Sequence, residues 1–307
     1  MNLFTEQING KKDWERVFES IPAFAPLVEY ILSKESLPVA ELKSLTPGTN
    51  FVTRAGDYVV KVFAPEESRY KQEFDFQSEI FATNRAFDLG VPTPKIIASG
   101  LIEDKYSFDY IITEFIEGIE LENVLGNKTD AEKTNIGKRL RFMTDKMNLP
   151  CAPFNEADPI NDESNDWSWE KYPERFKTKR HEYIRSYAYG EKVLVHGDLC
   201  SDNILITPKG DLYLIDFADA VLAPIEYEHA LVAIGLFDLD TAFLRGYFSG
   251  YTVDEMLEVC FSGILIQGYG GEDLPWHVGK PHEFQCLEDL RVRLKARLED
   301  NVPRRAQ

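Results

Sequence analysis

Three short apolar runs between residues 193 and 216 alternate with polar loops. Runs of this length, rich in Val, Ile and Leu and bounded by turn residues, predict buried strands. The side chains of Asp198, Asn203 and Asp216 therefore fall on loops at strand ends, where a rigid frame can hold them close together. The pattern predicts a framed cluster of oxygen-bearing side chains, as a catalytic site requires.

These residue types suit phosphoryl transfer. That reaction needs a carboxylate that orients the attacking hydroxyl and accepts its proton, and oxygen ligands that hold Mg²⁺ against the phosphates. We assign the first role to Asp198 and the second to Asn203 and Asp216. A lone His-x-Asp or Ile-Asp-Phe is more often structural, but both motifs in this order, with strands on both sides, favour a functional site. We expect His196 to brace the loop by hydrogen bonding, because the nearby carboxylate already serves as the base.

The rest of the chain divides at Gly118 into a strand-rich part and a helical part. Residues 40–63 predict three short strands separated by turns, followed by a helix over residues 67–88. Two more strands are expected over residues 95–102 and 108–116. The pattern predicts a small β-rich lobe, a hinge near 115–119, and a larger helical lobe.

Two stripes of apolar residues, each at helical spacing, lie in the larger lobe. We interpret both as core packing without a functional role: Ile136, Leu140, Met143 and Met147, then Leu287, Leu290, Leu294 and Leu298. Between them, residues 155–166 hold five carboxylates and no Lys or Arg, a composition that favours a solvated loop over a binding segment.

Two segments resemble the motifs of a known family: His196-Gly-Asp198-Leu-x-x-x-Asn203 and Ile215-Asp216-Phe217. The family is that of aminoglycoside phosphotransferases and choline kinases, a branch of the protein-kinase-like fold, and the resemblance covers about residues 40–235. It implies an α+β bilobal fold, with a nucleotide-binding antiparallel sheet lobe over residues 1–117. A mainly helical lobe over residues 118–307 would carry catalysis and the substrate site. The implied cofactors are ATP and Mg²⁺, and the implied partner is a small-molecule hydroxyl acceptor.

The resemblance also implies a lysine–glutamate pair for the nucleotide phosphates. In the family, a lysine on the third strand holds the α- and β-phosphates, and Lys61 occupies that place. A glutamate on the following helix pairs with this lysine. We choose Glu79 for that role, with Glu73 as the alternative.

A short turn and the hinge complete the implied nucleotide site. The turn that covers the nucleotide ends in Gly48, Thr49 and Asn50, whose backbone amides can approach phosphate. The several glycines typical of protein kinases are missing from it. Glu114 and Ile116 would bound the hinge and present backbone groups to adenine.

The sequence departs from the protein-kinase pattern in ways that argue against a protein kinase. Gly197 replaces the arginine of the His-Arg-Asp triplet, and Cys200 replaces the lysine two residues after the catalytic aspartate. We interpret Cys200 as a small space-filling side chain rather than a nucleophile. Only about ten residues separate Asp216 from Glu226, which leaves no room for an activation loop. A protein kinase is therefore disfavoured, and a catalytically idle relative is disfavoured by the intact motif residues.

The charge of the chain limits its partners. There are 34 Lys and Arg against 52 Asp and Glu, which gives a formal net charge of −18. A chain so acidic repels nucleic-acid backbones and anionic lipid surfaces, so we expect neither as a partner. Solubility alone explains such an excess, although a cationic substrate also fits it. The sequence makes no prediction of oligomeric state.

The cysteines and the apolar pattern indicate a cytoplasmic protein. The four cysteines are far apart and form no Cys-x-x-Cys pair, which disfavours both a disulfide framework and a zinc site. Residues 1–12 are polar and lack the apolar core of a signal peptide. No apolar run reaches the length of about 20 residues that a membrane span needs.

The acceptor is expected on the helical lobe. An aminoglycoside-type antibiotic is favoured, with choline, homoserine or an amino sugar as alternatives. Acidic residues in suitable regions are Asp158, Asp162, Glu163, Asp166, Glu226, Glu228, Asp238 and Asp240. Aromatic residues able to enclose a quaternary ammonium are Trp167, Trp169, Tyr172, Tyr187, Tyr189 and Trp276.

Overall fold

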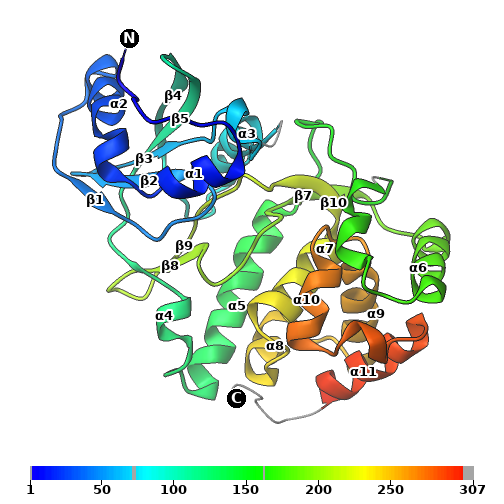
Figure 1. Ribbon diagram of the computed structural model, residues 1–307. Coiled ribbons are helices and arrows are strands. Elements are labelled where there is room, and N and C mark those ends of the chain that lie inside the picture. Colours follow the sequence, from blue (N-terminus) through cyan, green and yellow to red (C-terminus); the bar gives the residue numbers. More distant parts are fainter. Residues whose placement is uncertain (1, 71–73, 162, 300–307) are drawn as a thin grey trace.

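The computed structural model of the chain describes residues 2–70, 74–161 and 163–299. Two lobes meet at a cleft, and the upper lobe is built on a five-stranded antiparallel sheet (Figure 1). Its order is β1-β2-β3-β5-β4, with β1 (Leu42–Ser44), β2 (Phe51–Ala55), β3 (Tyr58–Val62), β4 (Ile96–Glu103) and β5 (Ser107–Glu114). These bounds confirm the strands expected in this part of the chain.

The β2–β3 hairpin determines which face of the sheet Lys61 occupies. Its two-residue loop includes Gly56 at a φ of +63°, a left-handed conformation that glycine adopts without strain. Side chains alternate between the two faces along a strand. Val60 and Val62 are buried in the core of the upper lobe, so Lys61 between them points to the opposite face, which lines the cleft.

Two N-terminal helices, α1 (Lys11–Val17) and α2 (Ile21–Lys34), complete the upper lobe. Ser20 caps α2 by accepting a hydrogen bond from the Ala23 amide, and a proline lies in the first turn, where it costs no backbone hydrogen bond. The helices bury aromatic side chains against the sheet, and Phe24 stacks on Phe51 with ring centroids 4.2 Å apart. The sheet therefore has one face covered by α1 and α2.

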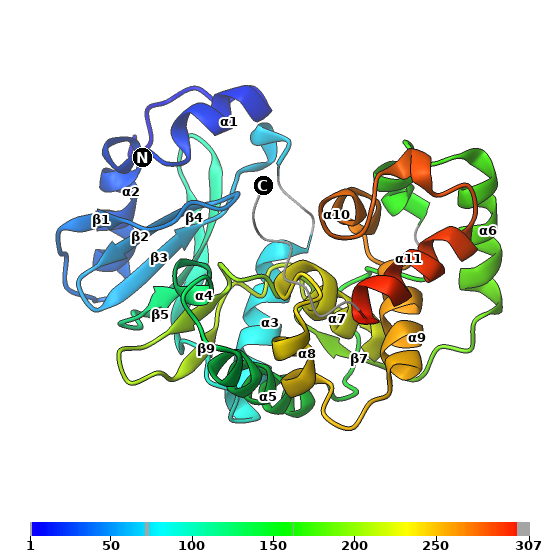
Figure 2. The same cartoon turned by 90° about the horizontal axis from the view of Figure 1, so that it is seen from below.

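The helix expected over residues 67–88 begins later than predicted. A single 3-10 turn, η1 (Glu66–Ser68), ends at Arg69, whose φ of 58° is left-handed and interrupts the helical path. The helix proper is α3 (Asp75–Asp88), and the alternative glutamate Glu73 lies outside the described residues. Helix α3 packs against β4 and β5 and also against α5 of the lower lobe, so it lies between the lobes (Figure 2).

The lower lobe is mainly helical, with two small sheets that carry the loops of the site. One sheet pairs β7 with β10, and the other has the order β6-β8-β9. The elements are β6 (Ile119–Glu120), α4 (Glu122–Leu125), α5 (Asp130–Met147), η2 (Glu163–Trp169), α6 (Glu174–Ser186), β7 (Lys192–Val195), β8 (Ile204–Ile206), β9 (Leu212–Leu214), β10 (Val221–Pro224), α7 (Ile225–Ala230), the π-helix η3 (Leu231–Leu236), α8 (Thr241–Tyr247), α9 (Val253–Ile264), α10 (Gly270–His277), η4 (Pro281–Glu283) and α11 (Leu287–Glu299).

Both predicted apolar stripes lie in the core of this lobe. Helix α5 buries Ile136, Leu140, Met143 and Met147, whereas α11 buries three of its four leucines and leaves Leu287 partly buried. The fold is thus the expected α+β bilobal one, with a small antiparallel sheet lobe and a larger helical lobe. Among the described residues, no helix has the length and apolarity needed to cross a membrane.

Candidate active site

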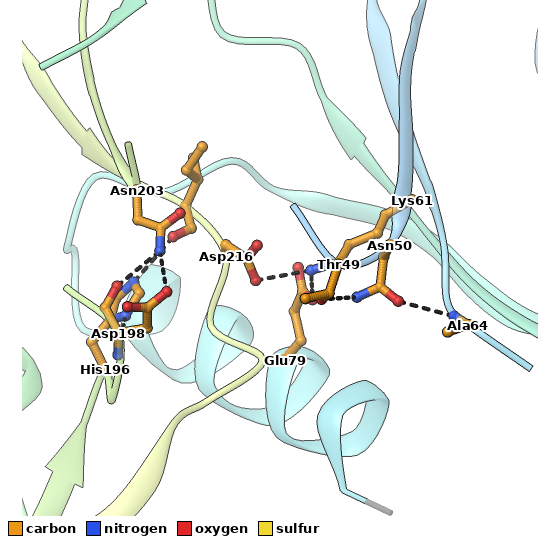
Figure 3. Close-up of polar contacts among 10 residues, drawn as sticks. Thr49, Asn50, Lys61, Ala64, Glu79, His196, Asp198, Asn203 and Asp216 are labelled. Carbon is orange, nitrogen blue, oxygen red and sulfur yellow. Dashed lines mark hydrogen bonds and ion pairs between the residues drawn. The ribbon is translucent and has the colours of Figure 1, made fainter. Parts of the chain in front are cut away.

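The loop between β7 and β8 and the exit of β9 bring the motif residues together (Figure 3). Asn203 donates two hydrogen bonds from Nδ2 to Asp198, 2.8 Å to the backbone carbonyl and 2.9 Å to Oδ2. Asp216 follows β9 with a φ of 60°, a left-handed conformation uncommon for aspartate. All three side chains belong to residues that line the cleft.

The carboxylate of Asp198 lies in an environment that favours proton uptake. Burial raises its pKa to about 6, and the negative charges of Asp219 and Asp216 add to the rise, against the hydrogen bond from Asn203. A carboxylate with a pKa near neutrality is a better proton acceptor than an ordinary exposed one. Asn203 binds Oδ2 and so orients the carboxylate.

His196 braces the loop, as expected. Its side chain is fully buried, and burial lowers its pKa to about 4, so the ring is neutral at physiological pH. The Asp198 amide donates to Nδ1 at 3.4 Å, which leaves Nε2 as the protonated nitrogen that donates to the Ile215 carbonyl at 3.1 Å. The imidazole therefore joins the loop of Asp198 to Ile215, the residue between β9 and Asp216.

Glu228 supports the same loop from below, a role that the sequence did not reveal. It is fully buried, and its Oε1 accepts the His196 amide at 3.2 Å. It also accepts a hydrogen bond from the Gly197 amide. Burial raises the pKa of Glu228 to about 7. Its placement among acceptor-binding candidates was wrong, because its side chain packs under the loop rather than facing the cleft.

Lys61 connects the two lobes. Its Nζ lies 2.6 Å from Glu79 Oε2 on α3 and 2.8 Å from Asp216 Oδ1 in the lower lobe. Burial alone would lower the pKa of Lys61, but the charges of Asp216 and Glu79 overcome it and raise that pKa. The same attraction lowers the pKa of Asp216 against the effect of burial. The glutamate that meets Lys61 is Glu79.

The implied turn and hinge residues also line the cleft. Gly48, Thr49 and Asn50 lie on the connection between β1 and β2, and Asn50 Oδ1 accepts the amide of Ala64 at 2.9 Å (Figure 3). At the other side, β5 ends at Glu114. The chain then passes to the lower lobe through Phe115 and Ile116, which also border the cleft.

The cleft has a volume of about 1590 Å³. Sites for single drug-sized ligands occupy roughly 300–1,000 Å³, so this cleft can hold a nucleotide and a second molecule together. One end is formed by the turn and hinge of the upper lobe. The other end is formed by α10, the segment 155–159 and residues before and within η3.

Carboxylates and aromatic rings border the part of the cleft near Asp198. The carboxylates include Asp75 at the start of α3, Asp219 and Asp273 of α10, and Trp167 meets Tyr269 edge to face at 5.3 Å. Burial raises the pKa of Asp75 to about 7, with Asp219 adding to the rise. Asp273 also acts on Asp198, because its charge contributes to the raised pKa of that residue.

Most acidic residues predicted for the acceptor have other partners. Asp158 does line the cleft, and it pairs with Lys192 at 2.8 Å. The others are held elsewhere: Asp166 by Arg180, Asp238 by His277 and Arg297, and Asp240 by Lys133. Asp162 and the side chain of Glu163 lie outside the described part of the chain, and Glu226 does not border the cleft.

The aromatic candidates divide in the same way. Trp167 borders the cleft, whereas Trp169 and Tyr172 are buried in the core of the lower lobe. Tyr187 and Tyr189 pack against each other with centroids 4.6 Å apart and do not border the cleft, and Trp276 is exposed outside it. The segment 155–159 is irregular and has no buried residue, as expected for a solvated loop, and it also borders the cleft.

Cys200 borders the cleft, and its side chain stays in the protonated thiol form, which is a poor nucleophile. Burial raises its pKa to about 12, and the charge of Asp198 adds to the rise. A thiolate, the reactive form, is therefore disfavoured at neutral pH.

Two oxygen atoms fit a magnesium ion that remains bound to phosphates and water. Asn203 uses Nδ2 in both of its hydrogen bonds, which leaves Oδ1 as the acceptor. Lys61 meets Oδ1 of Asp216, so Oδ2 lies outside this ion pair, although the carboxylate also accepts a hydrogen bond from the Ala218 amide. The described residues contain no group of three or more His, Cys, Asp or Glu that could hold a metal alone. Mg²⁺ in nucleotide sites takes one or two protein ligands plus phosphates, so two oxygens suffice.

The fold is shared with several solved kinases. A streptomycin–ATP–APH(2")-IIa ternary complex has a TM-score of 0.57 at 16% identity, covering 87% of this chain and 98% of that one. A choline/ethanolamine kinase family protein from Mesorhizobium loti gives 0.54 at 15% identity, with coverages of 89% and 95%. Choline kinase LicA from Streptococcus pneumoniae gives 0.53 at 16% identity, with coverages of 80% and 90%.

No curated protein matches the chain in sequence. The model of the phosphotransferase enzyme family matches residues 49–260, which is more than half of the 307 residues. This stretch contains the lysine, the loop between β7 and β8 and the exit of β9. The chain therefore belongs to the phosphotransferase enzyme family and is a small-molecule phosphotransferase with a protein-kinase-like fold.

Proposed function

We propose that the chain transfers the γ-phosphate of ATP, with Mg²⁺, to a hydroxyl of a small cationic molecule. The observation that carries the proposal is the convergence at Lys61, which meets Glu79 and Asp216 in a cleft that also contains Asp198. A buried lysine next to a carboxylate pair is placed to meet phosphate charge. The streptomycin–ATP–APH(2")-IIa ternary complex, which has the same fold, supports the choice of nucleotide.

Asp198 is the base in this proposal. Its Oδ2 is held by Asn203, so the other carboxylate oxygen is left to accept a hydrogen bond from the acceptor hydroxyl. As the hydroxyl oxygen bonds to the γ-phosphorus, its proton passes to Asp198 and ADP leaves. The charges of Asp219 and Asp216 favour this proton uptake, because they raise the pKa of Asp198.

The nucleotide lies against the upper lobe. Lys61 binds the α- and β-phosphates, Glu79 orients Lys61, and the turn at Gly48, Thr49 and Asn50 covers the phosphates. Backbone groups of the hinge between Glu114 and Ile116 hold adenine. Mg²⁺, held by Asn203 and Asp216, neutralises phosphate charge when bound.

The acceptor end of the cleft fits a cation. Asp75, Asp219 and Asp273 gather negative charge there, and the raised pKa of Asp75 reflects first the cost of burying its carboxylate and then the nearby negative charge of Asp219. An ammonium group lowers that cost by pairing with the carboxylates. An aminoglycoside-type antibiotic, with several ammonium groups, matches three carboxylates best, and such a substrate would make the protein an antibiotic-resistance enzyme.

A choline-like acceptor is the second candidate, favoured by one specific observation. Trp167 and Tyr269 meet edge to face at the cleft and are 46% and 60% exposed, so their ring faces are open to a ligand. Aromatic faces attract quaternary ammonium ions.

All four cysteines of the chain are free thiols: Cys151, Cys200, Cys260 and Cys286. Free thiols support a reducing, cytoplasmic setting for the reaction.

The test is an ADP-release assay with Mg·ATP and a panel of aminoglycosides, choline, homoserine and amino sugars. The proposal predicts that one cationic acceptor stimulates ADP release, and that Asp273→Asn raises its KM about tenfold, as expected for loss of a charged hydrogen-bond partner. The KM for ATP should not change. Stimulation by neutral acceptors alone would contradict a cationic substrate. If no small molecule stimulates ADP release and phosphate appears on protein substrates instead, the result would contradict the proposed function.

A further inference from the structure

We propose that helix α1 contributes to nucleotide binding. Its residue Trp14 is a positioning residue that orients the turn covering the phosphates. This inference rests on the proposed function, because the turn has a ligand to cover only if the cleft binds a nucleotide. Helix α1 precedes the stretch that matches the family model, which starts at residue 49. The inference therefore concerns a part of the chain to which the family match assigns nothing.

The turn has little internal means of holding a fixed shape. It connects β1, which ends at Ser44, to β2, which begins at Phe51. Gly48 has no atom within 4 Å of the position that a Cβ would take, so packing does not confine it. Backbone amides bind phosphate well only when they are already oriented, because ordering them on binding costs free energy. The orientation must therefore come from outside the turn.

Trp14 supplies a hydrogen bond to the turn from the hydrophobic core. Its Nε1 donates to the carbonyl of Thr49 at 2.9 Å, and its side chain is only 1% exposed. The indole meets Phe24 edge to face at 5.9 Å. Phe24 in turn stacks on Phe51, the first residue of β2. The donor is thus fixed by rings packed against the strand that follows the turn.

This bond sets the direction of the next amide. In a trans peptide the C=O and the N–H of one peptide unit point in opposite directions, and no peptide bond of the described residues is cis. The Thr49 carbonyl points to Trp14, so the amide of Asn50 points away from the core. Thr49 and Asn50 both border the cleft. Holding the carbonyl therefore also holds a backbone donor.

Two further contacts fix the end of the turn and place the start of α1 at the cleft. Asn50 Oδ1 accepts the amide of Ala64 beyond β3, which anchors the far end of the turn (Figure 3). Lys11, the first residue of α1, borders the same cleft and lies over the ring of Tyr70 at 5.0 Å. Helix α1 thus reaches the cleft at Lys11 and the turn at Trp14.

The test removes the indole donor and compares two ligands that differ in their phosphates. Trp14→Phe deletes the N–H, and benzothienylalanine incorporated at position 14 keeps the shape of the indole while sulfur replaces the N–H. Calorimetric titrations with Mg·ATP and with adenosine give the two dissociation constants. We expect Mg·ATP to bind about fivefold more weakly in both variants, in line with the net worth of one hydrogen bond. Adenosine, which lacks the phosphates, should bind as in the wild type.

Phe4→Leu is the matched control, because Phe4 is buried in the same core and packs on Phe24 and Phe108 without reaching the turn. It should lower stability and leave Mg·ATP affinity unchanged. Unchanged Mg·ATP affinity in both position-14 variants would overturn the inference, as would parallel weakening of ATP and adenosine. Failure of the wild type to bind Mg·ATP would instead contradict the proposed function itself.

Discussion

Gly197 shows how closely the backbone packs beside the proposed base. Its φ is +86°, and a Cβ there would lie 1.9 Å from the carbonyl oxygen of Asp219. The position therefore excludes any side chain, including the arginine that protein kinases carry before their catalytic aspartate. Without a side chain at this position, the loop contacts the segment after Asp216 directly. His196 and Glu228 also support the loop.

Removing the acceptor at position 228 should disorder this loop. Glu228→Ala leaves the amides of His196 and Gly197 buried without partners, so we expect a loss of about 2–4 kcal/mol in the free energy of unfolding, together with a large fall in kcat. Glu228→Gln keeps one carbonyl acceptor and should cost much less on both measures. Urea denaturation and steady-state kinetics test this. Equal behaviour of the two variants would contradict the supporting role.

His229 should make stability dependent on pH. The ring is buried against Tyr247, with Nδ1 3.1 Å from the Tyr247 hydroxyl, and burial lowers its pKa to about 3. The unfolded chain has a histidine pKa of about 6.5, so below that pH the unfolded state binds a proton that the native state excludes. The His229 contribution is thus complete above about pH 6.5 and declines as pH falls towards 3.

The expected size is about 1.4 kcal/mol per pH unit. His229→Gln removes this titration, so the fall in its free energy of unfolding between pH 6.5 and pH 5 should be smaller than that of the wild type by about 1.5 kcal/mol in total. Urea denaturation at several pH values measures it. Parallel pH profiles for the variant and the wild type would show that His229 already takes up its proton in the folded state.

Helices α5 and α8 cross so closely that each needs a glycine at the contact. A Cβ on Gly137 would lie 2.3 Å from the carbonyl of Phe243, and a Cβ on Gly246 would lie 2.1 Å from the carbonyl of Thr134. Both obstacles are backbone atoms, which cannot move aside as a flexible side chain can. Helix α5 also buries the apolar stripe of the lower lobe, so a shift there would disturb the whole lobe.

Gly137→Ala should therefore destabilise the protein, although alanine is the better helix former. We expect a loss of about 1–3 kcal/mol in the free energy of unfolding, the usual cost of overpacking. The control is Gly126→Ala, because a Cβ there has no atom within 4 Å and the residue has helical backbone angles. That change should be neutral or slightly stabilising. A Gly137→Ala variant as stable as the wild type would contradict the close crossing.

Elements with a clear periodicity could be predicted, whereas contacts between distant elements could not. The stripe from Ile136 to Met147 repeats at helical spacing and is buried, and the β-branched runs around Lys61 form the central strands. The start of α3 was misplaced, because the left-handed turn at Arg69 leaves no trace in hydrophobic spacing. A local sequence pattern predicts the secondary structure of its own segment but not its contacts with distant elements.

The candidate site shows the same division. Asp198, Asn203 and Asp216 could be found, because each lies on a loop next to a strand end in an ordered motif. Asp75 and Asp273 could not, because they reach the cleft only through the packing of α3 and α10. Glu228 has no signal beyond its position in a helix after β10, and its role follows from the burial of that helix under the loop.

The whole molecule is organised around a cleft to which both lobes contribute. The upper lobe gives Lys61, α3 gives Glu79 and the lower lobe gives Asp216, so the ion pairs at Lys61 link all three parts (Figure 3). The segment after Asp216 passes directly into β10, which pairs with β7, and then into α7. The site is therefore assembled by the fold itself, without a long loop that would need ordering.

Acceptor-stimulated ADP release, compared between the wild type and Asp198→Asn, tests this account most directly. Asparagine keeps the size of the side chain but cannot accept the hydroxyl proton. We predict that kcat falls by about a thousandfold, in the range expected for loss of a general base. Mg·ATP affinity and thermal stability should stay close to those of the wild type. Undiminished turnover in Asp198→Asn would contradict the assignment of the base and the phosphotransfer mechanism built on it.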